Sequence, residues 1–92
     1  MKYSPYYTKK IRKQLRTLEK RGYNMSLFKE VVEMLLEGIP LPPKNNDHPL
    51  QGDKRGYRDC HILGDWVLIY KKDKQELILV LIETGTHSDI LE

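Results

Sequence analysis

The first apolar stripe along the chain has helical spacing. Its members, each three or four residues after the one before, are Tyr7, Ile11, Leu15 and Leu18. Such a stripe predicts one buried face on a helix. Ser4-Pro5 has the residue types of a helix start, because serine can cap and proline is pre-set for the first turn, and Gly22 has those of a helix end.

A second apolar stripe predicts a second helix. It consists of Leu27, Phe28, Val31 and Leu35, with Met34 and Leu36 beside it. Asn24 or Ser26 can cap this helix, and Gly38 can close it. Two helices joined by so few residues are expected to form an antiparallel hairpin.

Beyond Gly38 the pattern becomes that of a loop and then of strands. Residues 39–43 are proline-rich and cannot continue a helix, and residues 44–53 have the composition of a loop. The strand-like stretches that follow are 56–62, 65–71 and 77–82. We therefore predict one α+β domain, residues 1–92, in which an N-terminal helical hairpin packs on a small antiparallel β-sheet. Residues 1–3 could add a short edge strand.

The composition of the chain indicates where the protein is located and how its charge is distributed. Cys60 is the only cysteine, no leader for secretion is present, and no apolar run approaches the roughly 20 residues of a membrane helix. We therefore expect a cytoplasmic protein. Residues 1–22 carry eight Lys and Arg against Glu19 alone, a net charge of +7, whereas the remaining residues carry −4. This basic block either attracts a polyanion such as RNA or is the solvated face of a helix.

All three histidines lie in the second half of the chain, each within two residues of an aspartate. The segments are Asp47-His48, Asp59-Cys60-His61 and His87-Ser88-Asp89. Histidine exchanges protons near neutrality, and a neighbouring carboxylate can orient or charge it, so this grouping favours acid–base chemistry over three unrelated surface histidines. A base that deprotonates a ribose 2′-hydroxyl and an acid that protonates the departing 5′-oxygen can cleave RNA without a metal.

Zinc is a weaker interpretation of the same residues. On a strand, Asp59 and His61 point to one face and Cys60 to the other, and the chain has no CxxC or HxxxH pair. A hairpin that is symmetric about Leu63-Gly64 would pair His61 with Trp66, Asp59 with Leu68 and Tyr57 with Tyr70 on one polar face.

Four motifs, in their order and spacing, resemble those of the YafQ branch of the RelE/ParE toxin superfamily. They are Asp47-His48-Pro49-Leu50-Gln51-Gly52, Gly56-Tyr57-Arg58-Asp59-Cys60-His61, Asp65-Trp66-Val67-Leu68-Ile69-Tyr70 and Thr84-Gly85-Thr86-His87-Ser88-Asp89. The resemblance implies a RelE-like fold and a bacterial type II toxin that enters the ribosomal A site and cuts translated messenger RNA. It also implies a DinJ-like antitoxin, bound in a toxin–antitoxin hetero-oligomer.

The resemblance further implies the site residues. His87 is the expected general acid, and His48, His61 and Asp65 are candidates for the base and for orienting the scissile phosphate. Asp59 is the expected partner of His61. The resemblance implies no metal or other cofactor.

Two positions depart from the family pattern. Relatives commonly carry arginine where this chain has Glu83, and many carry an aromatic residue where it has Leu91, at a position expected to contact substrate. The first departure removes a phosphate-binding cation, for which Lys54, Arg55 or Arg58 could compensate. The second weakens base stacking.

Two alternatives assign the same fold a binding role without RNA cleavage. ParE-type relatives poison DNA gyrase by protein contact, but they are not expected to carry this histidine set. A degenerate member that only binds antitoxin is the other alternative, prompted by Glu83.

Overall fold

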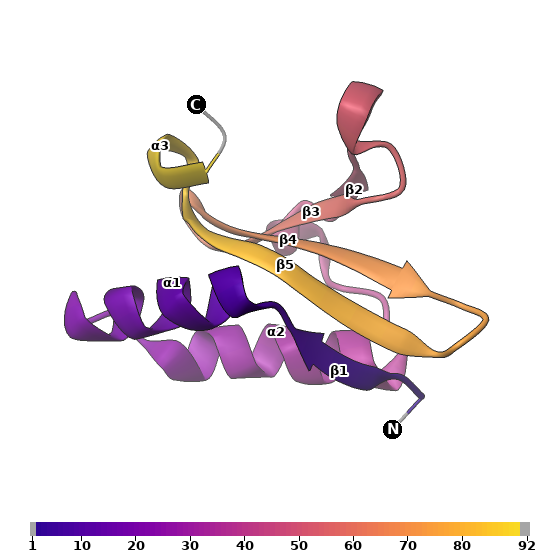
Figure 1. Cartoon of the computed structure of the whole chain (residues 1–92). Helices are drawn as coiled ribbons and strands as arrows, with labels where there is room; N and C mark the ends of the chain where they lie inside the picture. The colour runs from indigo at the N-terminus through magenta and orange to yellow at the C-terminus, as the bar shows by residue number, and fades with distance from the viewer. Residues whose placement is uncertain (1, 91–92) are drawn as a thin grey trace.

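Two helices cover one face of a five-stranded sheet in the computed structural model, which describes residues 2–90 (Figure 1). This arrangement confirms the predicted α+β class. The elements in chain order are β1 (Ser4–Tyr7), α1 (Lys9–Lys20), α2 (Met25–Glu37), η1 (Pro43–Asn45), β2 (His48–Pro49), η2 (Gly52–Lys54), β3 (Arg58–Leu63), β4 (Trp66–Asp73), β5 (Ile78–Thr86) and α3 (His87–Ile90).

The predicted start of the first helix at Ser4-Pro5 is wrong. Residues 4–7 form β1, an edge strand that pairs in parallel with residues 78–81 of β5. An edge position tolerates Pro5, which has no amide proton to donate. Thr8 is the true cap: its Oγ1 accepts a hydrogen bond from the Ile11 amide at 3.1 Å. Of the predicted stripe, Tyr7 therefore belongs to the strand, and the edge strand expected at residues 1–3 lies at 4–7.

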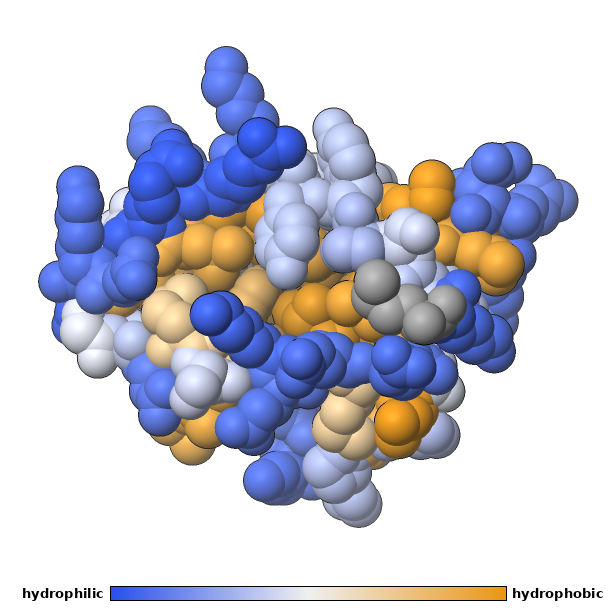
Figure 2. Space-filling view, turned by 90° about the horizontal axis from the view of Figure 1, so that it is seen from below, coloured by the Kyte–Doolittle hydropathy of each residue, from blue (hydrophilic) through white to orange (hydrophobic). Residues whose placement is uncertain are grey.

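The second helix begins and ends as predicted. Asn24 Oδ1 accepts a hydrogen bond from the Ser26 amide at 3.1 Å, and Gly38 closes the helix in the left-handed conformation, with φ of 76°. The two helices run in opposite directions beneath the sheet (Figure 1). A groove between them is lined by Tyr7, Leu15, Met25 and Phe28, among others. Seen from below, this side of the molecule shows apolar surface between hydrophilic side chains (Figure 2).

The sheet has the strand order β1-β5-β4-β3-β2. Strands β3, β4 and β5 form the predicted antiparallel meander, and β2 adds to it in antiparallel pairing. Because β1 pairs in parallel with β5, the whole sheet is mixed.

The predicted register of the β3–β4 hairpin is wrong by one residue. Leu63 pairs with Trp66 around a two-residue turn, and a bulge follows between His61 and Leu63. His61 is therefore opposite Val67, and Asp59 is opposite Ile69. A shift of one residue moves every partner to the other face of the sheet.

As a result, Trp66, Leu68 and Tyr70 share a face with Cys60, and this face packs against the helices. The predicted polar face that combined Asp59 and His61 with these aromatic residues does not exist. The buried cluster beneath the sheet comprises Tyr3, Ile11, Leu18, Phe28, Val31, Val32, Leu35, Leu36, Cys60, Ile62, Trp66, Leu68, Tyr70, Leu79 and Leu81. No helix within residues 2–90 is long and apolar enough to span a bilayer.

Candidate active site

The strand register gathers site residues on the sheet face that points away from the helices. His48 of β2 pairs with Asp59 of β3, and Asp59 pairs with Ile69 of β4, so their side chains form one row across this face. His61 lies two residues further along β3, on the same face and opposite Val67. The two histidines and the carboxylate thus come together because β2, a strand of two residues, returns the loop to the sheet.

His61 and His87 lie side by side although 25 residues separate them in sequence. Their ring centroids are 5.4 Å apart, with an angle of 55° between the ring planes. His87 is the first residue of α3, which follows directly on β5. His61 Nδ1 lies 2.8 Å from the Gly64 carbonyl oxygen. Since a carbonyl only accepts, Nδ1 donates, and Nε2 is the His61 atom left free for chemistry.

His48 is oriented in the same way. Its Nδ1 lies 3.2 Å from the Pro49 carbonyl oxygen, and its Nε2 lies 3.8 Å from Asp59 Oδ2. The second distance is within the range of an ion pair but too long for a hydrogen bond. His48 therefore presents Nε2 to the Asp59 carboxylate.

Asp59 is the buried charge of the site. Its side chain is 4% exposed, and its Oδ1 atom has no hydrogen-bond partner among residues 2–90. Burial raises the pKa of this carboxyl, and the positive charges of His48, His61 and His87 oppose the increase. An unpaired buried carboxylate oxygen destabilises a fold, so its presence beside three titratable rings points to function.

The remaining predicted positions lie outside this cluster. Asp65 is exposed in the turn next to Gly64, and none of the described hydrogen bonds or ion pairs joins it to a histidine. Lys54 and Arg55 are exposed, at the end of η2 and just after it. Arg58 pairs with Tyr70, so it belongs to the other face, and its Nε donates to Asp47 Oδ1 at 3.2 Å. Leu91 lies outside the described residues.

The sequence interpretation missed the role of Asp47. Its Oδ1 accepts hydrogen bonds from Arg58 Nε and, at 2.7 Å, from the Tyr70 hydroxyl. Burial raises the pKa of Tyr70, so this hydroxyl stays a donor. Asp47 thereby fixes the loop immediately before His48. The signal was an aspartate next to a loop histidine, but nothing in the sequence distinguished a carboxylate that holds the loop from one that holds the imidazole.

Glu83 is paired rather than free. It lies opposite Ile69, in the row that contains Asp59, and its Oε1 is 3.1 Å from Lys10 Nζ of α1. The Glu83 side chain is 11% exposed. Its negative charge is therefore largely covered and compensated by the first helix, although no arginine is present here.

The described residues offer no cluster suited to a metal. Within 2–90, no three His, Cys, Asp or Glu side chains are grouped as ligands. Cys60 is fully buried on the helix-covered face, and burial raises the pKa of its thiol, which disfavours the thiolate that zinc requires.

Comparison with known proteins gives consistent relatives. A family model described as the YafQ toxin of bacterial type II toxin–antitoxin systems matches residues 3–92. The chain is 39% identical over 83 residues to the mRNA interferase toxin YafQ of Escherichia coli K12, covering 89% of this chain and 88% of the relative. It is 44% identical over 68 residues to a putative toxin YafQ of Haemophilus influenzae, covering 71% of this chain and 67% of that one.

Solved structures agree with this result. A metal-bound toxin from Helicobacter pylori superposes with a TM-score of 0.90 at 39% identity, covering 96% of this chain and 98% of that chain. A chain of the E. coli DinJ–YafQ complex superposes with a TM-score of 0.89 at 34% identity, covering 98% of this chain and 99% of that chain.

Proposed function

The chain belongs to the YafQ family of toxins from bacterial type II toxin–antitoxin systems, and from this premise we propose that it is a ribosome-dependent endoribonuclease that cleaves messenger RNA. The observation that carries the proposal is the convergence of His61 and His87, with ring centroids 5.4 Å apart. The E. coli relatives are named mRNA interferases, which supports the same activity.

The proposed reaction is acid–base catalysis that needs no metal. A base takes the proton from the ribose 2′-hydroxyl, the 2′-oxygen forms a bond to the adjacent phosphorus, and the bond from phosphorus to the 5′-oxygen breaks. The products are a 2′,3′-cyclic phosphate and a free 5′-hydroxyl. His87 is the acid that protonates the leaving 5′-oxygen. Two imidazoles this close can act on the entering and leaving oxygens of one phosphodiester.

The remaining roles are divided among several residues. His48, His61 and Asp65 supply the base and orient the scissile phosphate. Asp59 places a buried carboxylate beside this cluster, with its Oδ2 3.8 Å from His48 Nε2, and helps to orient that imidazole. Lys54 and Arg55 are exposed cations available to the RNA backbone, whereas Arg58 is held by Asp47. Leu91 remains the predicted position for contact with a base.

We further propose that a DinJ-like antitoxin binds and silences this protein in the bacterial cytoplasm. One of the similar structures is a DinJ–YafQ complex. The basic α1 offers charge for either an acidic antitoxin segment or ribosomal RNA.

Primer-extension mapping of a defined message on translating ribosomes tests the proposal. Purified wild type and His87→Ala are compared, each with and without EDTA pretreatment of the protein, in buffer with magnesium restored. Cuts made by the wild type in both arms, and reduced about 10²–10⁴-fold by His87→Ala, are expected. Absence of cuts in every lane would refute the nuclease, and toxicity that persists in His87→Ala would favour action by protein contact.

A further inference from the structure

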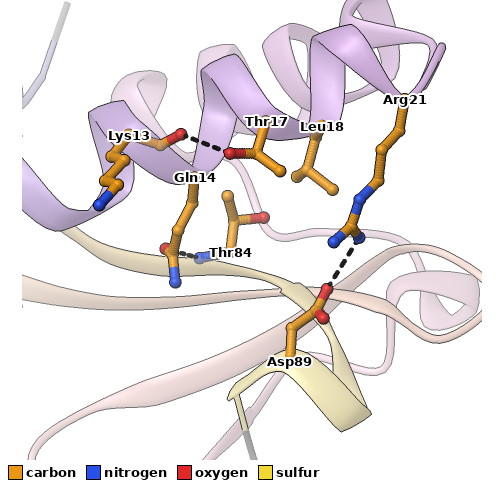
Figure 3. A pocket seen from close by; sticks show the side chains of 7 residues that line it. All are labelled: Lys13, Gln14, Thr17, Leu18, Arg21, Thr84 and Asp89. Atoms are coloured by element: carbon orange, nitrogen blue, oxygen red, sulfur yellow. Dashed lines mark hydrogen bonds and ion pairs between the residues drawn. The ribbon is translucent and has the colours of Figure 1, made fainter.

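The turn that carries His87 is tied to the first helix. α3 has only four residues, fewer than a helix needs to be stable by itself. Its Asp89 Oδ2 lies 3.3 Å from Arg21 Nη1. Figure 3 shows this contact at one end of a pocket that α1 forms with Thr84 of β5 and Asp89 of α3. A basic residue far away in sequence thus holds the segment that bears the expected general acid.

Asp89 also fixes the backbone on both sides of His87. Its Oδ2 accepts a hydrogen bond from the Thr86 amide at 3.1 Å, and its own amide donates to Thr86 Oγ1 at 3.2 Å. These reciprocal bonds bracket the two residues between them, the first of which is His87. The Thr86 bonds and then the Arg21 charge lower the pKa of Asp89, so the carboxylate stays ionised.

Gly85 makes the space for this arrangement. A Cβ atom at Gly85 would lie 3.1 Å from Asp89 Cβ and 3.2 Å from Asp89 Oδ2, closer than most such contacts, and the Gly85 φ of 157° is rare for other residues. The glycine therefore allows the Asp89 carboxylate to fold back onto Thr86. The motif from Thr84 to Asp89 contains both the histidine and the residues that aim it.

Arg21 is itself well placed to act as an anchor. It is the C-terminal cap of α1, and its amide donates to the carbonyl oxygens of Thr17 and Leu18. Leu18 is 2% exposed in the core. The guanidinium therefore extends from backbone that the core holds in place.

We propose that Arg21 and Asp89 are positioning residues that hold His87 against His61. This inference rests on the proposed function. The pair is largely exposed, with side chains 49% and 36% accessible, and exposed ion pairs add little to stability. The Arg21–Asp89 pair therefore acts on the position of His87 rather than on stability. Without the pair, α3 shifts and the imidazole of His87 moves away from the leaving oxygen.

Steady-state cleavage by Arg21→Gln and a matched Arg16→Gln variant tests the proposal. Both remove one charge from exposed positions near the same helix, so any general loss of attraction to RNA should raise KM equally. We expect kcat to fall about tenfold in Arg21→Gln alone, since small misplacements of a catalytic group cost up to about 10²-fold. Asp89→Asn should show the same loss, and Arg21→Lys should recover part of it. Equal kcat values for Arg21→Gln and Arg16→Gln would overturn the proposal.

A second readout does not require activity. In the free protein, nuclear Overhauser effects between the ring protons of His61 and His87 should be strong in the wild type and Arg16→Gln, and weak in Arg21→Gln. Melting temperatures of all variants should agree to within about 5 °C. Unchanged ring contacts in Arg21→Gln would overturn the positioning role. A wild type that cleaves nothing would refute the nuclease, and the ring contacts would still decide whether Arg21 positions His87.

Discussion

The two faces of the central sheet differ in whether their buried polar atoms have hydrogen-bond partners. On the helix-covered face, Trp66 and Tyr70 are buried with their polar atoms satisfied, since Trp66 Nε1 donates to Thr84 Oγ1 at 2.9 Å and the Tyr70 hydroxyl donates to Asp47. On the other face, Asp59 is equally buried but leaves Oδ1 without a partner in the described chain. The helix-covered face stabilises the fold. The other face is destabilising in part, because it holds a buried charge beside imidazoles.

Adjacent substitutions on β3 give the largest and cleanest contrast between the faces. His61→Ala should lower cleavage about 10²–10⁴-fold, because it removes a group proposed to move or orient a proton. Cys60→Ala, one residue earlier on the opposite face, should leave cleavage close to wild type and lower stability by about 1 kcal/mol. Cleavage assays on ribosomes and urea unfolding measure the two effects. Comparable cleavage by the two variants would remove the functional distinction between the faces.

A substitution on the helix-covered face should lower stability and leave catalysis nearly unchanged. Leu68 is fully buried between the helices and the sheet. Leu68→Ala should lower the free energy of unfolding by about 2–5 kcal/mol, through lost apolar burial and the cavity it leaves. At a temperature where the variant is still folded, kcat should stay within a factor of about two to three. A loss of kcat as large as that of His61→Ala would show that the core face also determines the chemistry.

The same division explains how much the sequence could predict. The apolar stripes of α2 and the runs of β4 and β5 report burial, so the helix-covered face and the α+β class followed from them. The start of α1 was mispredicted because Ser4-Pro5 suits a helix cap as well as an edge strand, and only pairing with β5 decides between them.

The sequence motifs predicted the residues of the candidate site but not their geometry. His48, Asp59, His61 and His87 were identified as residue types and by family resemblance. Their faces and partners depend on a bulge after His61 and a two-residue turn, which local sequence does not specify. The ties from Arg21 to Asp89 and from Lys10 to Glu83 span about seventy residues of sequence, so no local pattern could have indicated them.

Substitution of Asp59 tests whether the sheet face that carries the histidines lowers the stability of the fold. Asp59→Asn should raise the free energy of unfolding at pH 7 by about 1 kcal/mol, because it removes a buried charge, and should lower cleavage. Since the folded-state pKa of Asp59 is raised, the wild type gains stability relative to the variant as pH falls through that pKa. The advantage of Asp59→Asn should therefore shrink toward pH 4. Urea titrations between pH 4 and pH 7 follow it, and an advantage that grows on acidification would contradict a raised pKa.

The smallest expected effect concerns the ion pair between Lys10 of α1 and Glu83 of β5. Lys10 of α1 reaches Glu83, which lies in the cross-strand row of Asp59. Lys10→Ala leaves the mostly buried Glu83 carboxylate without its cation and should cost about 0.5–1 kcal/mol, whereas Lys9→Ala, which removes a neighbouring exposed charge, should cost less than about 0.3 kcal/mol. If the pair also shields RNA from Glu83, Lys10→Ala should raise KM more than Lys9→Ala does, and this difference should disappear when each lysine variant also carries Glu83→Gln. Identical KM values for both lysine variants would confine Glu83 to a structural role. Of the two carboxylates in this cross-strand row, only Asp59 would then belong to the candidate active site.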